Sequence, residues 1–516
     1  MTSPPETITT PARPRLPQTW PLTATLIATS LGFGVIQLDV TVVNVAVKQI
    51  GASFGGGISG LQWVVSAYTL VLAALILTAG ALGDRFGARR MLCTGFAVFT
   101  AASGLCGLST SLAMLIAARA VQGLGAALLG SCALALLNHS YTDPGRRTRA
   151  VGQFVAGASA ALSGGPVIGG FLIAAFGWRA IFFINVPLGA VGFWLALRYA
   201  SETDRSAGRP VDTRGAALAT IALAGFAAAV IEAGTYGFAS PWVLAALGCS
   251  LAAAVAFVAA ESRTASPMLP MSLFRRPGFV SPVTMGFLVN VCFYGLIFLF
   301  SLLFQAKHRM SALETGLAFL PMTAAILGAN LISGRVNAAI GPSRAILTGL
   351  AAMTAGCAGL LWVNPATGYP AMLAQQILLG GGLGTLVPPM TSVLLASADR
   401  SRSGVTSGAL TAFRQAGSLL GVALFGSLAA TDFYRGFHAA LCICVGILIV
   451  SAGVVVGAGI AGRRGGGGRA SAGPVCALYH DGHAFRRSRH AHPHRLEVLS
   501  RRRLRAGLPF AGPGLR

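Results

Sequence analysis

The chain has 516 residues and a formal net charge of +24, and 54% of its residues are hydrophobic while only 10% are charged. About a quarter of the residues of a soluble globular protein are charged, so this composition, with a mean hydropathy of +0.71, argues against a soluble enzyme or binding module. The charge distribution argues against a nucleic-acid-binding domain, because residues 463–516 alone hold twelve arginines against two acids.

The first apolar segment, residues 21–47, contains a single ionisable residue, Asp39. It is long enough to cross a hydrocarbon core of about 30 Å, which takes about 20 helical residues. It is too long for the core of a signal peptide and lacks a small-residue cleavage site. We therefore expect it to be the first helix of a multispanning protein.

Similar apolar segments follow along the whole chain, separated by short polar loops, and they predict fourteen transmembrane helices. The predicted helices are 21–47, 61–82, 91–109, 112–137, 150–173, 180–198, 215–234, 241–260, 280–305, 313–334, 344–363, 370–396, 405–430 and 438–460.

The basic residues of the loops orient these helices. If the N-terminus is inside, the inner loops and the helix ends that border them carry 17 Lys and Arg residues, and the outer loops carry 5. Cytoplasmic loops of membrane proteins have such an excess of positive charge. The prediction is a multi-pass protein of the cell (cytoplasmic) membrane with both termini in the cytoplasm.

A weak internal repeat suggests two related bundles. "GALGDRFGARR" (80–90) follows the second predicted helix, and "SGRVNAAIGPSR" (333–344) follows the tenth. Paired bundles around a site at the membrane midplane are a transporter architecture. The predicted parts are an N-terminal tail (1–20), a six-helix bundle (21–198), an inserted helix pair with its flanking loops (199–278), a second six-helix bundle (279–460) and an Arg/Gly/His-rich, disordered tail (461–516).

Four ionisable residues lie away from the ends of the predicted helices: Asp39, Arg119, Glu232 and Arg414. A charge near the membrane centre costs about 2.5–3.5 kcal/mol on insertion scales, so such residues usually face a partner or a functional pathway. For Asp39 and Glu232 the alternative is a place at the membrane interface. For Arg414 it is a structural ion pair.

Two further stretches carry recognisable patterns. In the fifth predicted helix, Gly157, Ala161, Gly165 and Gly169 recur every four residues and form a face that lets another helix approach closely, while Pro166 favours a bend. Ordinary helix packing uses such faces too. The turn "GALGDRFGARRML" (80–92) combines glycines with basic residues, which by itself indicates no more than a cytoplasmic turn.

Taken together, these stretches resemble the signatures of the major facilitator superfamily, and more narrowly of its fourteen-helix drug:proton antiporter branch. The resemblance spans roughly residues 20–460. The matching stretches are "LDVTVVNVAV", "GALGDRFGARR", "RAVQGLGAA", "GGPVIGG", "WRAIFFINVPLG", "GLAFLPM" and "SGVTSGALTAFRQAGSLLGVAL".

The resemblance implies a fold and residue roles. It implies an all-α membrane protein of two six-helix bundles plus an inserted pair. A site for protons or substrate would involve Asp39, Thr41, Asn44, Arg119, Gln122, Glu232 and Arg414. A latch that steadies one conformation would involve Gly80, Asp84, Arg85, Gly87 and Arg89. The antiporter helix would carry Gly157, Ala161, Gly165, Pro166 and Gly169.

This chain departs from the family pattern at three positions. Lys48 stands where the family usually has proline, Ala88 where it has a basic residue, and Ser131 near the usual place of a proline. None of the departures removes a titratable group from the membrane-spanning segments. They concern the outer end of the first helix and the bend of the fourth.

The predicted function is proton-coupled efflux of small amphipathic drugs, antibiotics or a metabolite. The protein would act as a monomer among membrane lipids, without cofactor, metal or nucleic acid, and draw energy from the proton gradient. Asp39 with Arg119 would load a proton outside and release it inside. The alternatives are an importer or facilitator of a small metabolite, or a membrane sensor, scaffold or enzyme. "HSYTD" (139–143) fits an acyltransferase pattern but has no companion motif.

The arginine-rich tail also contains five histidines, His480, His483, His490, His492 and His494. The tail could touch anionic lipid, capture a metal, or result from a misread frame.

Overall fold

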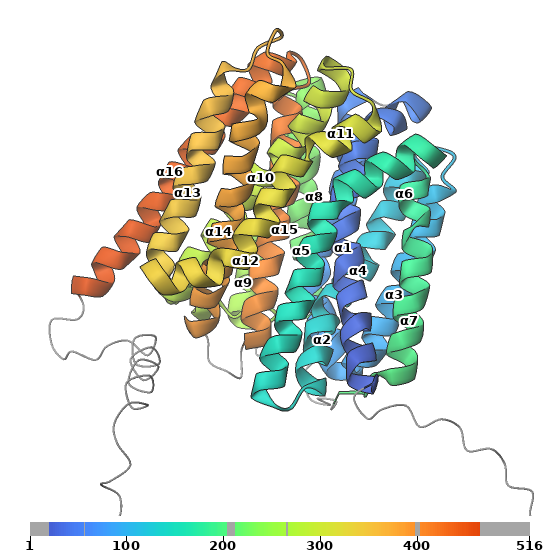
Figure 1. Ribbon diagram of the computed structural model, residues 1–516, viewed down its shortest axis with the longest axis vertical. Helices are drawn as coiled ribbons and strands as arrows, with labels where there is room; N and C mark the ends of the chain where they lie inside the picture. The colour runs from blue at the N-terminus through green and yellow to red at the C-terminus, as the bar shows by residue number, and fades with distance from the viewer. Residues whose placement is uncertain (1–19, 56, 204–211, 265–266, 398–402, 465–516) are drawn as a thin grey trace, which may run out of the picture. The chain divides into compact units, whose positions relative to one another are not determined.

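The computed structural model describes residues 20–55, 57–203, 212–264, 267–397 and 403–464, and every regular element in these residues is helical (Figure 1). The chain divides into one compact unit, Met1–Ala458, and a second unit, Gly459–Arg516, which begins in the last residues of the final helix. Nearly all of the predicted tails, with the five tail histidines, lies outside the described residues.

The helices follow the predicted order. The first part of the chain contains α1 (Trp20–Phe54), α2 (Gly57–Phe86), α3 (Ala88–Gly107), α4 (Leu112–Ser140), α5 (Pro144–Phe176), α6 (Ala180–Phe183), α7 (Asn185–Tyr199), α8 (Thr213–Tyr236) and α9 (Pro241–Arg263). The second part contains α10 (Pro277–Leu302), α11 (Ala312–Ala318), α12 (Leu320–Ile340), α13 (Pro342–Gly359), α14 (Leu373–Ser397), α15 (Ser403–Leu428) and α16 (Phe433–Arg464).

Thirteen helical stretches in the described residues are long and apolar enough to cross a membrane. The fourteenth membrane-length helix is α15, whose hydropathy is lowered by Arg414 and Gln415. In this count α6 continues into α7, and α11 into α12. The predicted fold class is therefore confirmed, with one passage for each of the fourteen apolar segments.

Several helices are longer than the apolar segments that predicted them. For example, α1 continues past Lys48 to Phe54, and α5 begins at Pro144, before the predicted residue 150. Hydropathy marks only the stretch that would lie in hydrocarbon, while capping residues determine where a helix starts. The side chain of Asp143 accepts a hydrogen bond from the Arg146 amide (2.8 Å) and so caps α5. This is a structural role for the aspartate of the acyltransferase-like pattern.

The helices pack in two groups that meet along a few of their members. In the first group α1 packs against α4, α5 and α7, and Figure 1 shows it between α5 and α7. In the second, α10 packs against α15, and α14 against α12 and α13. The groups meet through α2 with α15 and through α5 with α11 and α12, while α8 packs against both α2 and α15.

Two corresponding turns share one backbone feature. Gly87, between α2 and α3, has φ of 100°, and Gly341, between α12 and α13, has φ of 82°. Glycine adopts positive φ without the steric cost that a side chain brings. These are the two loops of the weak internal repeat.

Candidate functional site

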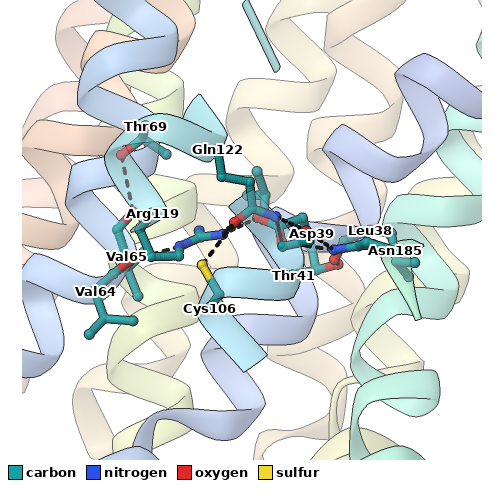
Figure 2. A network of polar contacts seen from close by, with 12 residues as sticks. Leu38, Asp39, Thr41, Val64, Val65, Thr69, Cys106, Arg119, Gln122 and Asn185 are labelled. Carbon is teal, nitrogen blue, oxygen red and sulfur yellow. Dashed lines mark hydrogen bonds and ion pairs between the residues drawn. The ribbon is translucent and has the colours of Figure 1, made fainter. Parts of the chain in front are cut away.

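The centre of the site is an ion pair between two transmembrane helices. Arg119 of α4 donates from Nη1 to Oδ2 of Asp39 on α1 (Figure 2). Only 2% of Asp39 and 1% of Arg119 are exposed. A buried charge is tolerated when it is paired and hydrogen-bonded. The placement of Asp39 therefore fits a partner inside the bundle and not an interfacial cap.

Gln122 bridges the two charges. It lies three residues after Arg119 and thus on the same face of α4. Its Oε1 accepts a hydrogen bond from Arg119 Nη1 (2.7 Å), and its Nε2 donates to Asp39 Oδ1 (2.9 Å). Both the carboxylate and the guanidinium are thereby held in a fixed orientation.

Two residues that the sequence analysis did not single out complete the carboxylate side. Asn185, the first residue of α7, donates to Asp39 Oδ1 (3.3 Å) and to Ser103 Oγ (3.2 Å). Ser103 of α3 also accepts from Gln122 Nε2 (2.6 Å). Asn185 lies within the quoted stretch "WRAIFFINVPLG", and an amide side chain inside an apolar segment was the signal that could have identified it. Ser103 lies in an apolar helix and offers none.

Arg119 has further partners that do not depend on Asp39. Its Nε donates to the backbone oxygen of Val64 (3.1 Å), and its guanidinium lies 4.4 Å from the ring centroid of Tyr68, both on α2. A cation over an aromatic face is attracted by the ring. The guanidinium would thus stay anchored if Asp39 became neutral.

Thr41 and Asn44 lie on α1, as Asp39 does, but their side chains donate hydrogen bonds to backbone oxygens of that helix. Thr41 Oγ1 donates to Leu38 O (3.0 Å), and Asn44 Nδ2 donates to Val40 O (2.7 Å). Both residues are buried. Their side-chain hydrogen bonds do not join them to the network around Asp39.

Glu232 and Arg414 lie away from the ion pair. Glu232 of α8 accepts hydrogen bonds from Ser59 Oγ and Trp63 Nε1, both at 3.1 Å, so it ties α8 to α2. Arg414 is a half-buried residue of α15 whose Cγ lies 3.2 Å from where a Cβ on Gly286 of α10 would be. The structure therefore brings Asp39, Arg119 and Gln122 together and leaves these two elsewhere.

The small residues of α5 allow close packing on both sides of the helix. A Cβ on Gly165 would collide with the hydroxyl of Thr41, and one on Gly169 would lie 3.3 Å from the Cα of Val42. On another side, the Pro166 carbonyl oxygen lies against Gly316 of α11. Nearer the start of α5, Gly157 and Ala161 line a groove of about 410 Å³ that α1 also lines. The predicted antiporter helix thus contacts α1 and the second group of helices together.

Hydrogen bonds near Lys48 and Gln62 join the two groups. Lys48 Nζ of α1 donates to the Gln305 backbone oxygen (2.9 Å) in the π-helical turn after α10. In addition, Gln62 Nε2 donates to Ala423 O (2.7 Å). Lys48, the departure from the family proline, thereby joins the first group to the second.

The predicted latch turn packs against the end of α7. The Arg89 amide donates to Glu202 Oε1 (3.0 Å), the Arg89 guanidinium donates to Leu197 O, and Arg90 lies 3.8 Å from Glu202 Oε2. Gly80 and Asp84 lie in the last two turns of α2, and Arg85 covers the ring of Phe86. Glu202, which the sequence did not single out, is the acceptor that organises this turn.

Replacing Gly87 with alanine should lower the yield of correctly folded protein. Gly87 has φ of 100°, and an added Cβ would overlap the carboxylate of Glu202. Positive φ costs a non-glycine residue about 1–2 kcal/mol, before the overlap is counted. We expect a lower melting temperature of the detergent-purified protein. The control is Gly104→Ala on α3, where a Cβ meets no atom within 4 Å; equal melting temperatures for the two variants would contradict the assignment.

The fold and the site define a class of protein. In the described residues, thirteen apolar stretches of membrane length and the helix α15 accompany a buried carboxylate–guanidinium pair that amides hold within the first group. This is the architecture of a multispanning membrane transporter.

Comparison with known proteins identifies the family: residues 29–422 match the model of the Major Facilitator Superfamily, and the chain belongs to it. It is 35% identical over 409 residues to the drug efflux pump JefA of Mycobacterium tuberculosis, covering 79% of this chain and 80% of the relative. It is 37% identical to the methylenomycin A resistance protein of Bacillus subtilis, covering 78% and 86%. It is 31% identical to the tetracenomycin C resistance and export protein of Streptomyces glaucescens, covering 82% and 78%.

A solved structure supports the fold. The crystal structure of the human organic anion transporter MFSD10 superimposes with a TM-score of 0.60, covering 85% of this chain and all of that chain, at 17% sequence identity. At this identity the likeness concerns the fold alone.

Proposed function

We propose that this protein exports small amphipathic drugs or antibiotics across the cytoplasmic membrane in exchange for protons. The observation that carries the proposal is the buried Asp39–Arg119 pair inside the membrane-spanning helices. Several relatives are named as drug efflux or antibiotic resistance proteins, which supports the direction and the substrate class.

The proposed coupling step is protonation of Asp39. A proton on this carboxyl group removes its negative charge and weakens its bond with Arg119. Arg119 then remains on the Val64 carbonyl, the Gln122 amide and the Tyr68 ring, which hold its charge in place. The pair therefore has two arrangements that differ by one proton, as a switch needs.

The remaining predicted residues belong to the conformational change. In this proposal residues 21–198 and 279–460 rock against each other, with both termini in the cytoplasm. The contacts around Lys48 and Gly316 would close the outer end. The turn with Asp84 and Arg89 would steady the opposite state, and α5 would act as the pivot.

A resistance panel tests this function. Expressed in an efflux-deficient bacterial host, the protein should raise the inhibitory concentration of methylenomycin A or tetracenomycin C, the compounds for which two relatives are named. The increase should disappear with a sublethal dose of an uncoupler, because efflux would depend on the proton gradient. Unchanged susceptibility to these and to other compound classes would refute drug export. Intracellular accumulation of a compound would instead indicate an importer.

A further inference from the structure

We propose that Arg414, together with the hydroxyl groups of Tyr294 and Tyr68, binds the anionic group of the transported compound, which makes carboxylate-bearing amphipathic molecules the preferred substrate class. This inference rests on the proposed transport function and deepens it. It begins from the charges that the membrane-spanning helices contain.

The charges of the membrane-spanning helices do not cancel around Arg414. Asp39 is neutralised by Arg119 within one network. Glu232 is occupied by Ser59 and Trp63. Among the described residues no carboxylate forms an ion pair with Arg414, and its guanidinium donates no hydrogen bond to any of them. An unpaired cation within a membrane protein usually faces a substrate or ion pathway.

Arg414 lies on the side of α15 that faces α10. On the same side of the helix, Leu410 lies against Gly286, and Gly417 against the carbonyl oxygen of Phe287, all on the α10 side. The opposite side of α15 packs on α8, where Ala423 meets Val230 and Ile231. Arg414 is partly exposed, and its side chain contacts Gly286 on the α10 side of the helix and not the α8 side.

Two tyrosines extend this environment toward the ion pair. Tyr294, two helical turns after Gly286 on α10, interacts electrostatically with Arg414 and with Tyr68 of α2. The Tyr68 hydroxyl is fully buried and has no hydrogen-bond partner, while its ring lies under Arg119. A buried hydroxyl left without a partner costs free energy. It is therefore a second, independent sign that a polar group of a ligand belongs here.

The chemistry of the three groups selects the ligand. A guanidinium has only donors, and a phenol donates readily to an anionic oxygen. A planar carboxylate accepts two parallel bonds from a guanidinium, and such charge-assisted bonds are stronger than neutral ones. A cationic drug would meet Arg414 with repulsion. The apolar part of the compound would lie among the aromatic and aliphatic residues that surround these groups.

Binding to the purified full-length protein in detergent tests the proposal without transport. The probes share one ring system: 1-naphthoate is anionic at pH 7, 1-naphthamide is neutral, and 1-naphthylmethylamine is cationic. We expect 1-naphthoate to bind at least about tenfold more tightly than the other two. Arg414→Gln should remove this preference and leave 1-naphthamide binding unchanged. Arg414→Lys should retain part of it, and Tyr294→Phe should weaken it severalfold.

The control is Arg335→Gln, which neutralises an exposed arginine of α12 and should change nothing. Size-exclusion profiles and the preserved binding of 1-naphthamide show that the variants are folded. Equal affinities for 1-naphthoate and 1-naphthamide, an absence of 1-naphthoate binding, or an affinity unaffected by Arg414→Gln would overturn the proposal. If the protein exports a drug but does not prefer 1-naphthoate, the proposed transport function stands and the anion site at Arg414 is refuted. If it prefers 1-naphthoate but shows no proton-dependent export, the anion site stands and the proposed transport function is refuted.

Discussion

Replacing Asp39 with asparagine should abolish efflux driven by a pH gradient. Asparagine has nearly the same shape and can still accept a hydrogen bond from Gln122, but it carries no charge and binds no proton. We expect uphill transport into inverted membrane vesicles to fall at least about 100-fold, because the coupled proton has lost its acceptor. The measurement is accumulation of a drug found by the resistance panel, after an imposed pH gradient.

The variant should still fold. Removing one partner of a buried ion pair commonly costs about 3–5 kcal/mol, but Arg119 keeps Val64, Gln122 and Tyr68. Similar amounts of protein in the membrane and a similar melting temperature would support this. The matched control is Asp432→Asn, which neutralises an exposed carboxylate that caps α16. Full uphill transport by Asp39→Asn would rule out a coupling role for this residue.

Replacing Gly165 with alanine should block the conformational cycle. The added Cβ would collide with the Thr41 hydroxyl and lie 3.0 Å from the Thr41 Cβ. Overpacking of this kind costs on the order of 1–3 kcal/mol, and it forces α5 away from α1 where both are closely packed. We expect transport to fall at least about tenfold at an unchanged amount of protein, measured as the initial rate of efflux from loaded cells.

The neighbouring glycine provides the control. A Cβ on Gly164 would meet only Ile168, at 3.5 Å in the same helix, so Gly164→Ala should transport normally. Combining Gly165→Ala with Thr41→Ala removes the colliding hydroxyl and should restore part of the rate. A Gly165→Ala protein as active as Gly164→Ala would show that close contact between these helices is not needed for transport.

Much of the fold follows from local physical chemistry. Apolar length predicts each crossing, since a helix that satisfies its own backbone is one of only two structures that can span a bilayer. The pairing of Asp39 with Arg119 follows similarly, because two opposite charges in a membrane favour each other strongly. The resemblance to the family implies a role for Gln122, which lies with Arg119 in the motif "RAVQGLGAA".

The rest of the site depends on which helices pack against each other, and local sequence patterns do not predict that packing. Ser103 is one of many serines in apolar helices, and only the packing of α3 against α4 and α7 brings it to Gln122. The same holds for Glu202, which reaches the turn at Arg89 across a long stretch of chain. The sequence groups Glu232 and Arg414 with Asp39 because ionisable residues are rare in the predicted helices. It contains no information on whether the three side chains lie close together.

The most direct test of proton coupling through Asp39 is a measurement of proton movement during transport. The purified protein is reconstituted into liposomes that contain a pH-sensitive dye, without an imposed pH gradient, and a concentration gradient of the exported drug is applied. We expect drug flow to drive protons in the opposite direction in the wild type. In Asp39→Asn, drug would move down its gradient without proton movement. Drug flow with no proton counterflow in the wild type, or unchanged proton counterflow in Asp39→Asn, would contradict this expectation.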